Sequence, residues 1–262
     1  MKINWKSKTI IVKVGSSTLL KGTKINSDFV KELAEEIVAV KKNGFNILIV
    51  TSGAVALGTA ALNLAEKTVA NLQAAASVGQ SMLMHAYTSE FQKHRMLTSQ
   101  FLLSRSIFKS EALSSDLKKI LAKVKDTVPI LNENDAIYAQ GLIGFFDNDS
   151  LAANLGVVLG ADLIVVLSEV DGLYTANPAT DKDAKKIAVV EEIGQGHLQM
   201  AGEKSGQGRG GMAAKLDAVK YATENGVTTI VTSGLNRNFL SRIIKGEDLG
   251  TVFLPKKSSG SD

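Results

Sequence analysis

"TIIVKVGSSTLL", residues 9–20, is an apolar β-type run that ends at Gly15, Ser16 and Ser17 and contains one lysine, Lys13. Apolar runs of the same kind recur along the chain, at residues 46–51, 97–103, 128–131, 163–167 and 228–232. Segments with apolar residues on one helical face alternate with them, at residues 27–43, 72–91, 113–124 and 151–159. This alternation predicts an α/β protein with a mostly parallel sheet and helices on both of its faces.

The composition limits the class of protein. A chain of 262 residues, 45% of them apolar, can fill the core of one large α/β domain or of two small ones. Residues 1–8 are polar and charged, unlike a signal peptide, and no apolar run approaches the ~20 residues that span a bilayer. We therefore expect a cytoplasmic protein with no membrane partner, and a loose tail over residues 255–262.

The cysteine and histidine content and the distribution of charge exclude further classes of site and partner. The chain has no cysteine, so it has no disulfide or thiolate metal site, and its three histidines share no metal-binding spacing. Its 30 basic and 26 acidic residues give a net charge of +4, and the basic residues are scattered along the chain. No nucleic-acid partner is expected, whereas a mild positive charge suits an enzyme that handles anions.

Lys13 allows two interpretations. A lysine close to the end of an apolar run can extend its side chain to the surface and have no further role. Alternatively, it can face the loops at the carboxyl ends of the strands, where open α/β sheets bind their ligands. One such loop is "VTSGAVALG", residues 50–58, in which Ser52 and Gly53 precede a helix. Ser52 could be an ordinary helix cap, or the loop could present backbone N–H groups to an anion beside Lys13.

Two polar segments follow further along the chain. In "LNENDAI", residues 131–137, a strand ends in a cluster of amide and carboxylate side chains. An Asx turn explains such a cluster, but Asp135 could also hold an ammonium group and an asparagine a carboxylate. In "FFDNDSLAA", residues 145–153, Asp147, Asn148 and Asp149 begin an apolar helix, with a spacing that is not that of a calcium loop.

The last hundred residues contain a glycine-rich segment. "SGQGRGGMAAK", residues 205–215, matches the dinucleotide pattern G-x-G-x-x-G, but no clear strand precedes it. It also fails as a P-loop, because Met212 occupies the position of the P-loop lysine. The segment is either a loop without a ligand or a phosphate-covering loop that leads into a helix carrying Lys215.

Together these residues suit phosphoryl transfer to a carboxylate. The chain offers two lysines, several aspartates and glycine-rich helix starts, but no candidate nucleophile or general base. A carboxylate acceptor is already ionised, so its phosphorylation requires positioning and neutralisation of phosphate charge.

The chain resembles the amino-acid kinase family. The resemblance rests on six segments in the same order, "KVGSS", "VTSGAVALG", "LNENDAI", "FFDNDSLAA", "GLYTANP" and "GGMAAK". It implies a three-layer α/β/α sandwich with a mostly parallel central sheet over residues 1–254, the N-terminal part binding mainly the acceptor and the C-terminal part mainly the nucleotide. "NEND" followed by "DND" is most similar to members that transfer the γ-phosphoryl group of ATP to the γ-carboxylate of glutamate, the first step of proline synthesis.

The resemblance also implies roles for single residues. Lys13 and Lys215 would act on the transferring phosphoryl group, and Asp149 would orient them. The residues implied for glutamate are Ser52, Gly53, Asn134, Asp135 and Asn148. Those implied for ATP are Lys13, Ser168, Glu169, Arg209, Gly210, Gly211, Met212, Ala213, Ala214 and Lys215. Mg²⁺ would be bound through the ATP phosphates rather than by the protein.

The chain departs from the family pattern at three places. Glu169 stands where an aspartate is usual, and Arg209 and Ala214 replace two hydroxyl residues of the common "TGGMxTK". We expect a kinase core that ends near Leu254, without the RNA-modification-type (PUA) domain of many relatives, and we expect this core to suffice for catalysis.

The resemblance further implies a homo-oligomer, a dimer or tetramer, with proline as feedback inhibitor. The alternatives are an acetylglutamate, aspartate or uridylate kinase, a non-catalytic nucleotide and amino-acid sensor, and a dinucleotide oxidoreductase.

Overall fold

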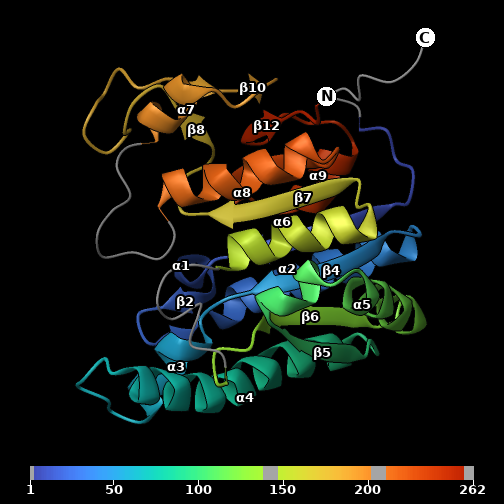
Figure 1. Ribbon diagram of the computed structural model, residues 1–262, viewed down its shortest axis with the longest axis vertical. Helices are drawn as coiled ribbons and strands as arrows, with labels where there is room; N and C mark the ends of the chain where they lie inside the picture. Colours follow the sequence, from blue (N-terminus) through green and yellow to red (C-terminus); the bar gives the residue numbers. More distant parts are fainter. Residues whose placement is uncertain (1–2, 138–146, 202–210, 257–262) are drawn as a thin grey trace.

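The computed structural model describes residues 3–137, 147–201 and 211–256. Its centre is an eight-stranded sheet in the order β10-β12-β11-β7-β1-β4-β6-β5 (Figure 1). The strands are β1 (Thr9–Val14), β4 (Asn46–Thr51), β5 (Thr98–Leu103), β6 (Val128–Glu133), β7 (Leu163–Ser168), β10 (Val189–Val190), β11 (Thr228–Ser233) and β12 (Thr251–Phe253). Among the described strands of this sheet, β11 and β12 form the only antiparallel pair, so the mostly parallel sheet is confirmed.

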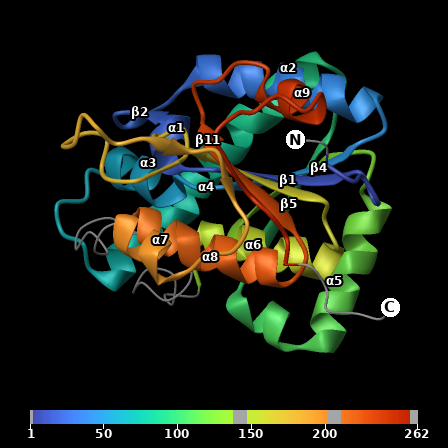
Figure 2. The same ribbon diagram turned by 90° about the horizontal axis from the view of Figure 1, so that it is seen from above.

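Helices cover both faces of the sheet (Figure 2). One face packs on α2 (Ser27–Lys42), α3 (Ala54–Ala61), α4 (Val69–Lys93) and α9 (Phe239–Ile244). The other packs on α5 (Glu111–Lys123), α6 (Asn148–Leu159) and α8 (Met212–Glu224). Successive side chains of a strand point to opposite faces, so Ile10 and Val12 enter the first core while Ile11 enters the second. The three-layer α/β/α arrangement is confirmed.

Smaller elements surround the sheet. They are α1 (Ser16–Leu19), α7 (Gln195–Met200), a 3-10 helix (Arg105–Lys109), the hairpin of β2 (Leu20–Lys21) and β3 (Lys24–Ile25), and the hairpin of β8 (Leu173–Tyr174) and β9 (Lys186–Ile187). Sequence patterns did not predict these short elements, because each is too short to show a hydrophobic period.

Helix caps decide where two helices begin. The predicted helix over 151–159 starts three residues earlier, because Asp147 accepts a hydrogen bond from Ser150 N (2.8 Å). The predicted helix over 72–91 also starts earlier, after Thr68, whose hydroxyl accepts from Asn71 N (3.2 Å). The first of these extensions matters for function, since it places Asn148 and Asp149 in the first turn of α6.

Helix α3 packs on α4 through glycines. A Cβ atom at Gly58 would collide with the carbonyl group of Ala75, and one at Gly79 with the carbonyl group of Ala54. The two backbones therefore lie in direct contact, which only residues without a Cβ allow. Since α3 follows Ser52 and Gly53 directly, α4 fixes the position of that loop.

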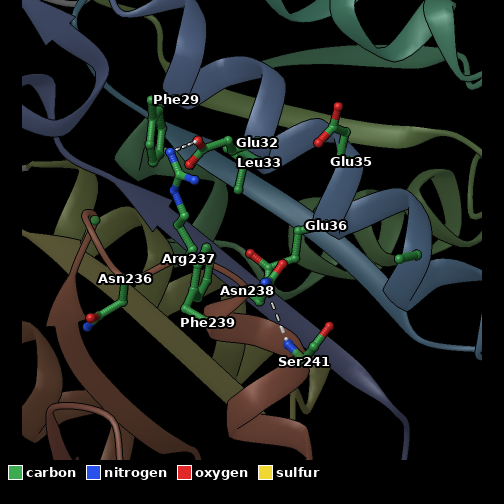
Figure 3. A pocket seen from close by; sticks show the side chains of 12 residues that line it. Phe29, Glu32, Leu33, Glu35, Glu36, Asn236, Arg237, Asn238, Phe239 and Ser241 are labelled. Atoms are coloured by element: carbon green, nitrogen blue, oxygen red, sulfur yellow. Dashed lines mark hydrogen bonds and ion pairs between the residues drawn. The ribbon is translucent and has the colours of Figure 1, made fainter.

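A pocket of about 310 Å³ separates α2 from the loop that leads into α9 (Figure 3). At its rim Arg237 pairs with Glu32 (2.8 Å), and deeper in the pocket Glu36 accepts a hydrogen bond from Ser241 N (3.1 Å). Glu36 is buried, and burial raises its pKa from 4.5 to about 7, against the opposing effect of the hydrogen bonds from Ser241 and Leu240.

We expect Glu36→Gln to change the pH dependence of stability. The pKa of Glu36 is higher in the folded state than the ordinary value, so its contribution to stability is complete below about pH 4.5 and is lost as the pH rises through about 7. A glutamine does not titrate, so the variant should gain stability relative to wild type by up to about 1.4 kcal/mol per pH unit across this window. Urea unfolding between pH 4.5 and 8 measures the difference.

The matched control is Glu35→Gln, because Glu35 is an exposed carboxylate on the same helix. A difference between Glu36→Gln and wild type that stays constant over this pH range would contradict the assignment.

Candidate functional site

Lys13 lies at the carboxyl end of the central strand. It is the second-last residue of β1, level with Val50 of β4 and Val166 of β7. Its side chain is only 6% exposed and its Nζ atom lies 2.8 Å from Asp149 Oδ1. The interpretation that Lys13 only extends to the surface is therefore wrong.

Asp149 joins two lysines from different elements. Its Oδ1 atom faces Lys13 of β1, and its Oδ2 atom lies 3.7 Å from the Nζ atom of Lys215, the fourth residue of α8. All three side chains are at least nine-tenths buried. They carry two positive charges and one negative charge, and a buried excess of positive charge favours the binding of an anion.

The charge states follow from the surroundings. Burial acts to raise the pKa of Asp149, but the nearby Lys13 and Lys215 outweigh it and hold the pKa below its ordinary value. Asp149 is therefore ionised at neutral pH. The pKa of Asp147 is raised, first by burial and then by the charge of Asp149. Sequence reasoning identified Asp147 only as a helix cap and missed its electrostatic coupling to Asp149 and Lys13.

The loop after β4 is tied to the start of α6. Asn148 Nδ2 donates to Ser52 Oγ (3.0 Å), so two residues predicted for glutamate are brought together. Gly53 adopts a left-handed conformation (φ 103°) just before α3, which a residue with a side chain would adopt only with strain. The loop between β4 and α3 therefore requires glycine at this position.

Asn134 and Asp135 follow β6, the neighbour of β4. Both are half-buried, and Asn134 N donates to Leu103 O of β5 (2.8 Å). Because β4 and β6 are parallel neighbours, the loops that follow them share one edge of the sheet. The residues predicted for glutamate thus lie just after β4 and β6, which are on one side of β1 in the sheet, and in the first turn of α6. Their roles stay predictions.

Apart from Lys13, the described residues that are predicted for ATP lie at the end of β7, on the side of β1 opposite β4, and at the start of α8. Ser168 ends β7, and Glu169 is exposed just after it. Gly211 caps α8, and Met212, Ala213 and Ala214 form its first turn before Lys215; Met212 packs against the core beneath α8. Arg209 and Gly210 lie outside the described residues.

The described segments contain no candidate metal site and no candidate membrane span. No three His, Cys, Asp or Glu side chains in these segments are grouped to hold a metal ion. No helix within them has the length and apolar character to cross a membrane.

Comparison with known proteins relates this geometry to a family. A model of the amino acid kinase family matches residues 8–233. Glutamate 5-kinase of Clostridium perfringens is 37% identical over 260 residues, covering 96% of this chain and 97% of its own. Glutamate 5-kinase of Clostridium acetobutylicum is 35% identical over 253 residues, covering 94% of both chains. The enzyme of that name from Caldanaerobacter subterraneus is 36% identical over 95% of this chain, but only 68% of its own length is matched.

Proposed function

The chain belongs to the amino acid kinase family, and on this premise we propose that it transfers the γ-phosphoryl group of ATP to the γ-carboxylate of L-glutamate, the first step of proline synthesis. The observation that carries the proposal is the buried cluster of Lys13, Asp149 and Lys215. It supplies fixed positive charge and no general base, which is what an ionised acceptor requires.

The strand order supports a division of labour. In the sheet, β4 and then β6 lie on one side of β1, and β7 lies on the other side. The loops after β4 and β6 would hold glutamate, whereas the end of β7 and the start of α8 would hold ATP. Lys13, on the central strand, would therefore meet the γ-phosphoryl group on its path between the two ligands. Lys215, at the start of α8, would stabilise the same charge from the nucleotide side. Asp149 would hold both ammonium groups in place.

On the acceptor side, Asp135 would bind the α-ammonium group of glutamate, and Ser52, Gly53, Asn134 and Asn148 would orient its carboxylates. Mg²⁺, which would enter with the phosphates of ATP, neutralises phosphate charge when bound. Asp149 is better suited to positioning the two lysines than to binding a metal ion, because both of its carboxylate oxygens face ammonium groups.

Trapping the acyl phosphate tests the proposed reaction. The protein is incubated with Mg-ATP, hydroxylamine and one candidate acceptor at a time, namely glutamate, acetylglutamate or aspartate; release of ADP is followed with uridylate. We expect a hydroxamate with glutamate alone. A hydroxamate with another acid, or ADP formed with uridylate, would identify a different kinase of this family, and ATP binding without ADP release would indicate a sensor. Family membership leaves no support for the oxidoreductase alternative.

We further propose that the protein is a cytoplasmic homo-oligomer, a dimer or tetramer.

We also propose that L-proline inhibits the phosphorylation of glutamate by binding at the glutamate site. Proline has the α-carboxylate and the charged α-nitrogen of glutamate but lacks its γ-carboxylate, so Asp135 could hold either ligand. Glutamate saturation curves at several proline concentrations test the shared site. Excess glutamate should overcome the inhibition, and Asp135→Asn should weaken the binding of both.

A further inference from the structure

Gln80 is a polar residue in the core-facing stripe of α4. The buried residues of this helix are Ala75, Ala76, Gly79, Gln80, Leu83, Tyr87 and Phe91. All the others are small or apolar, or in the case of Tyr87 hydrogen-bonded to Thr51 (3.0 Å). A buried amide costs free energy unless it is hydrogen-bonded, so the bonds of Gln80 indicate what it does.

The amide orientations of Gln80 and Asn132 fix each other. Asn132 Oδ1 accepts from Glu133 N (2.9 Å), so Asn132 Nδ2 faces the other way and donates to Gln80 Oε1 (2.9 Å). Turning either amide around would place two donors or two acceptors together. The orientation of Gln80 leaves its Nε2 atom buried and without a hydrogen-bond partner among the described residues.

Gln80 therefore makes one side-chain hydrogen bond, to Asn132, and its unsatisfied Nε2 donor costs free energy of folding. The free-energy cost of an unsatisfied buried donor is at least as large as the contribution of a typical buried hydrogen bond. The bond to Asn132 thus adds little to the stability of the fold. It does fix the end of β6, because Asn132 in turn holds the backbone of Glu133, one residue before Asn134.

Helix α4 contacts the two loops that would hold glutamate. Gly79, next to Gln80, packs against the first residue of α3, Ala54, which follows Ser52 and Gly53. Further toward the start of α4, Gln73 Nε2 donates to Ile137 O, just beyond Asp135 (3.2 Å). Gln80 follows directly after Gly79 and lies two helical turns beyond Gln73, on the same helix.

We propose that Gln80 is a positioning residue for the amino-acid substrate, which acts through Asn132 to hold the backbone that carries Asn134 and Asp135. This inference rests on the proposed function, since it takes glutamate as the ligand of those two residues. Gln80 itself does not touch the phosphoryl group or the nucleotide in this arrangement.

The test is Gln80→Met, which keeps the volume of the side chain and removes both of its polar atoms. Loss of the bond leaves Asn132 Nδ2 unpaired, but the unsatisfied Nε2 donor also disappears, so the thermal midpoint should move by no more than about 2 °C. Hydrogen exchange of residues 132–135 without ligands should become about 3- to 10-fold faster. The KM for glutamate should rise by about 3- to 10-fold, while the KM for ATP stays within about twofold.

Two further variants distinguish a positioning role of Gln80 from a role in packing alone. Gln80→Glu keeps an acceptor for Asn132 Nδ2 and should restore slow exchange in residues 132–135. Gln92→Met changes an exposed glutamine of the same helix and should leave every measurement at its wild-type value. In a double-mutant cycle, Gln80→Met should add little to Asn132→Ala, because both remove the same bond.

The outcomes distinguish this inference from the proposed function. Wild-type protein that phosphorylates glutamate, together with Gln80→Met that leaves the exchange rate or the KM for glutamate unchanged, would overturn the role of Gln80. An equal rise in both KM values with a large loss of stability would also overturn it, by making Gln80 a packing residue. Wild-type protein that forms no hydroxamate with glutamate would refute the proposed function, and the exchange rates alone would then decide whether Gln80 anchors the loop.

Discussion

Lys13→Ala is expected to lower kcat by about 100-fold or more while the protein still folds. The Lys13 ammonium group is buried on the central strand, between the loops proposed for glutamate and for ATP. Charge that develops there during transfer would lose a preorganised partner that water replaces poorly. Folding should survive because Asp149 keeps Lys215 as a cationic neighbour (3.7 Å). Turnover is measured by hydroxamate formation, and folding by circular dichroism.

A matched lysine supplies the control. Lys21 pairs with Asp28 (3.3 Å) at the surface, where an ion pair contributes little, so Lys21→Ala should retain wild-type turnover. Lys13→Met, which keeps most of the side-chain volume, should be as inactive as Lys13→Ala. Soluble Lys13→Ala protein with near-normal turnover would show that this lysine has no role in catalysis.

Asp149→Asn should also lower kcat by about 100-fold or more, and it should reduce kcat more than it weakens glutamate binding. The carboxylate holds two buried ammonium groups in place, and an amide cannot balance their charge. Removing one partner of a buried ion pair costs about 3–5 kcal/mol, so this variant should also unfold at lower urea concentration. Steady-state kinetics and urea unfolding measure the two effects.

Asp147→Asn is the matched control for Asp149→Asn. Asp147 is the cap of α6, and asparagine caps a helix about as well, so α6 should keep its position. The variant also leaves Asp149 in contact with both lysines, and its loss of kcat should be much smaller. A change confined to the half-saturation for glutamate in Asp149→Asn would refute the orienting role of Asp149.

Much of the fold could be read from local patterns. The apolar runs predicted β1, β4, β5, β6, β7 and β11. In β1, β4 and β7 most positions are apolar, because these strands are buried on both faces. The long amphipathic helices were predicted for a similar reason. Helix starts were less predictable, because α4 and α6 begin at capping side chains that precede their apolar period. The hairpin of β8 and β9 has strands of two residues each and leaves no such pattern.

The sequence by itself determined the α/β class and the approximate positions of the main strands, since each follows from a local pattern. It also placed Lys13 and Ser52 near strand ends and Asp149 at a helix start, whereas β6 runs two residues beyond its predicted end at residue 131. Tertiary structure alone decided which of these residues meet. Only the parallel register of β1 with β4 and β7, and the packing of α6 and α8 on one face, bring Lys13 and Lys215 to a single carboxylate. The role proposed for Gln80 could not be predicted from the sequence either, because it depends on a hydrogen bond to Asn132, which only the tertiary structure brings beside it. Spacing along a chain encodes local structure, whereas contacts between distant residues depend on how the layers pack.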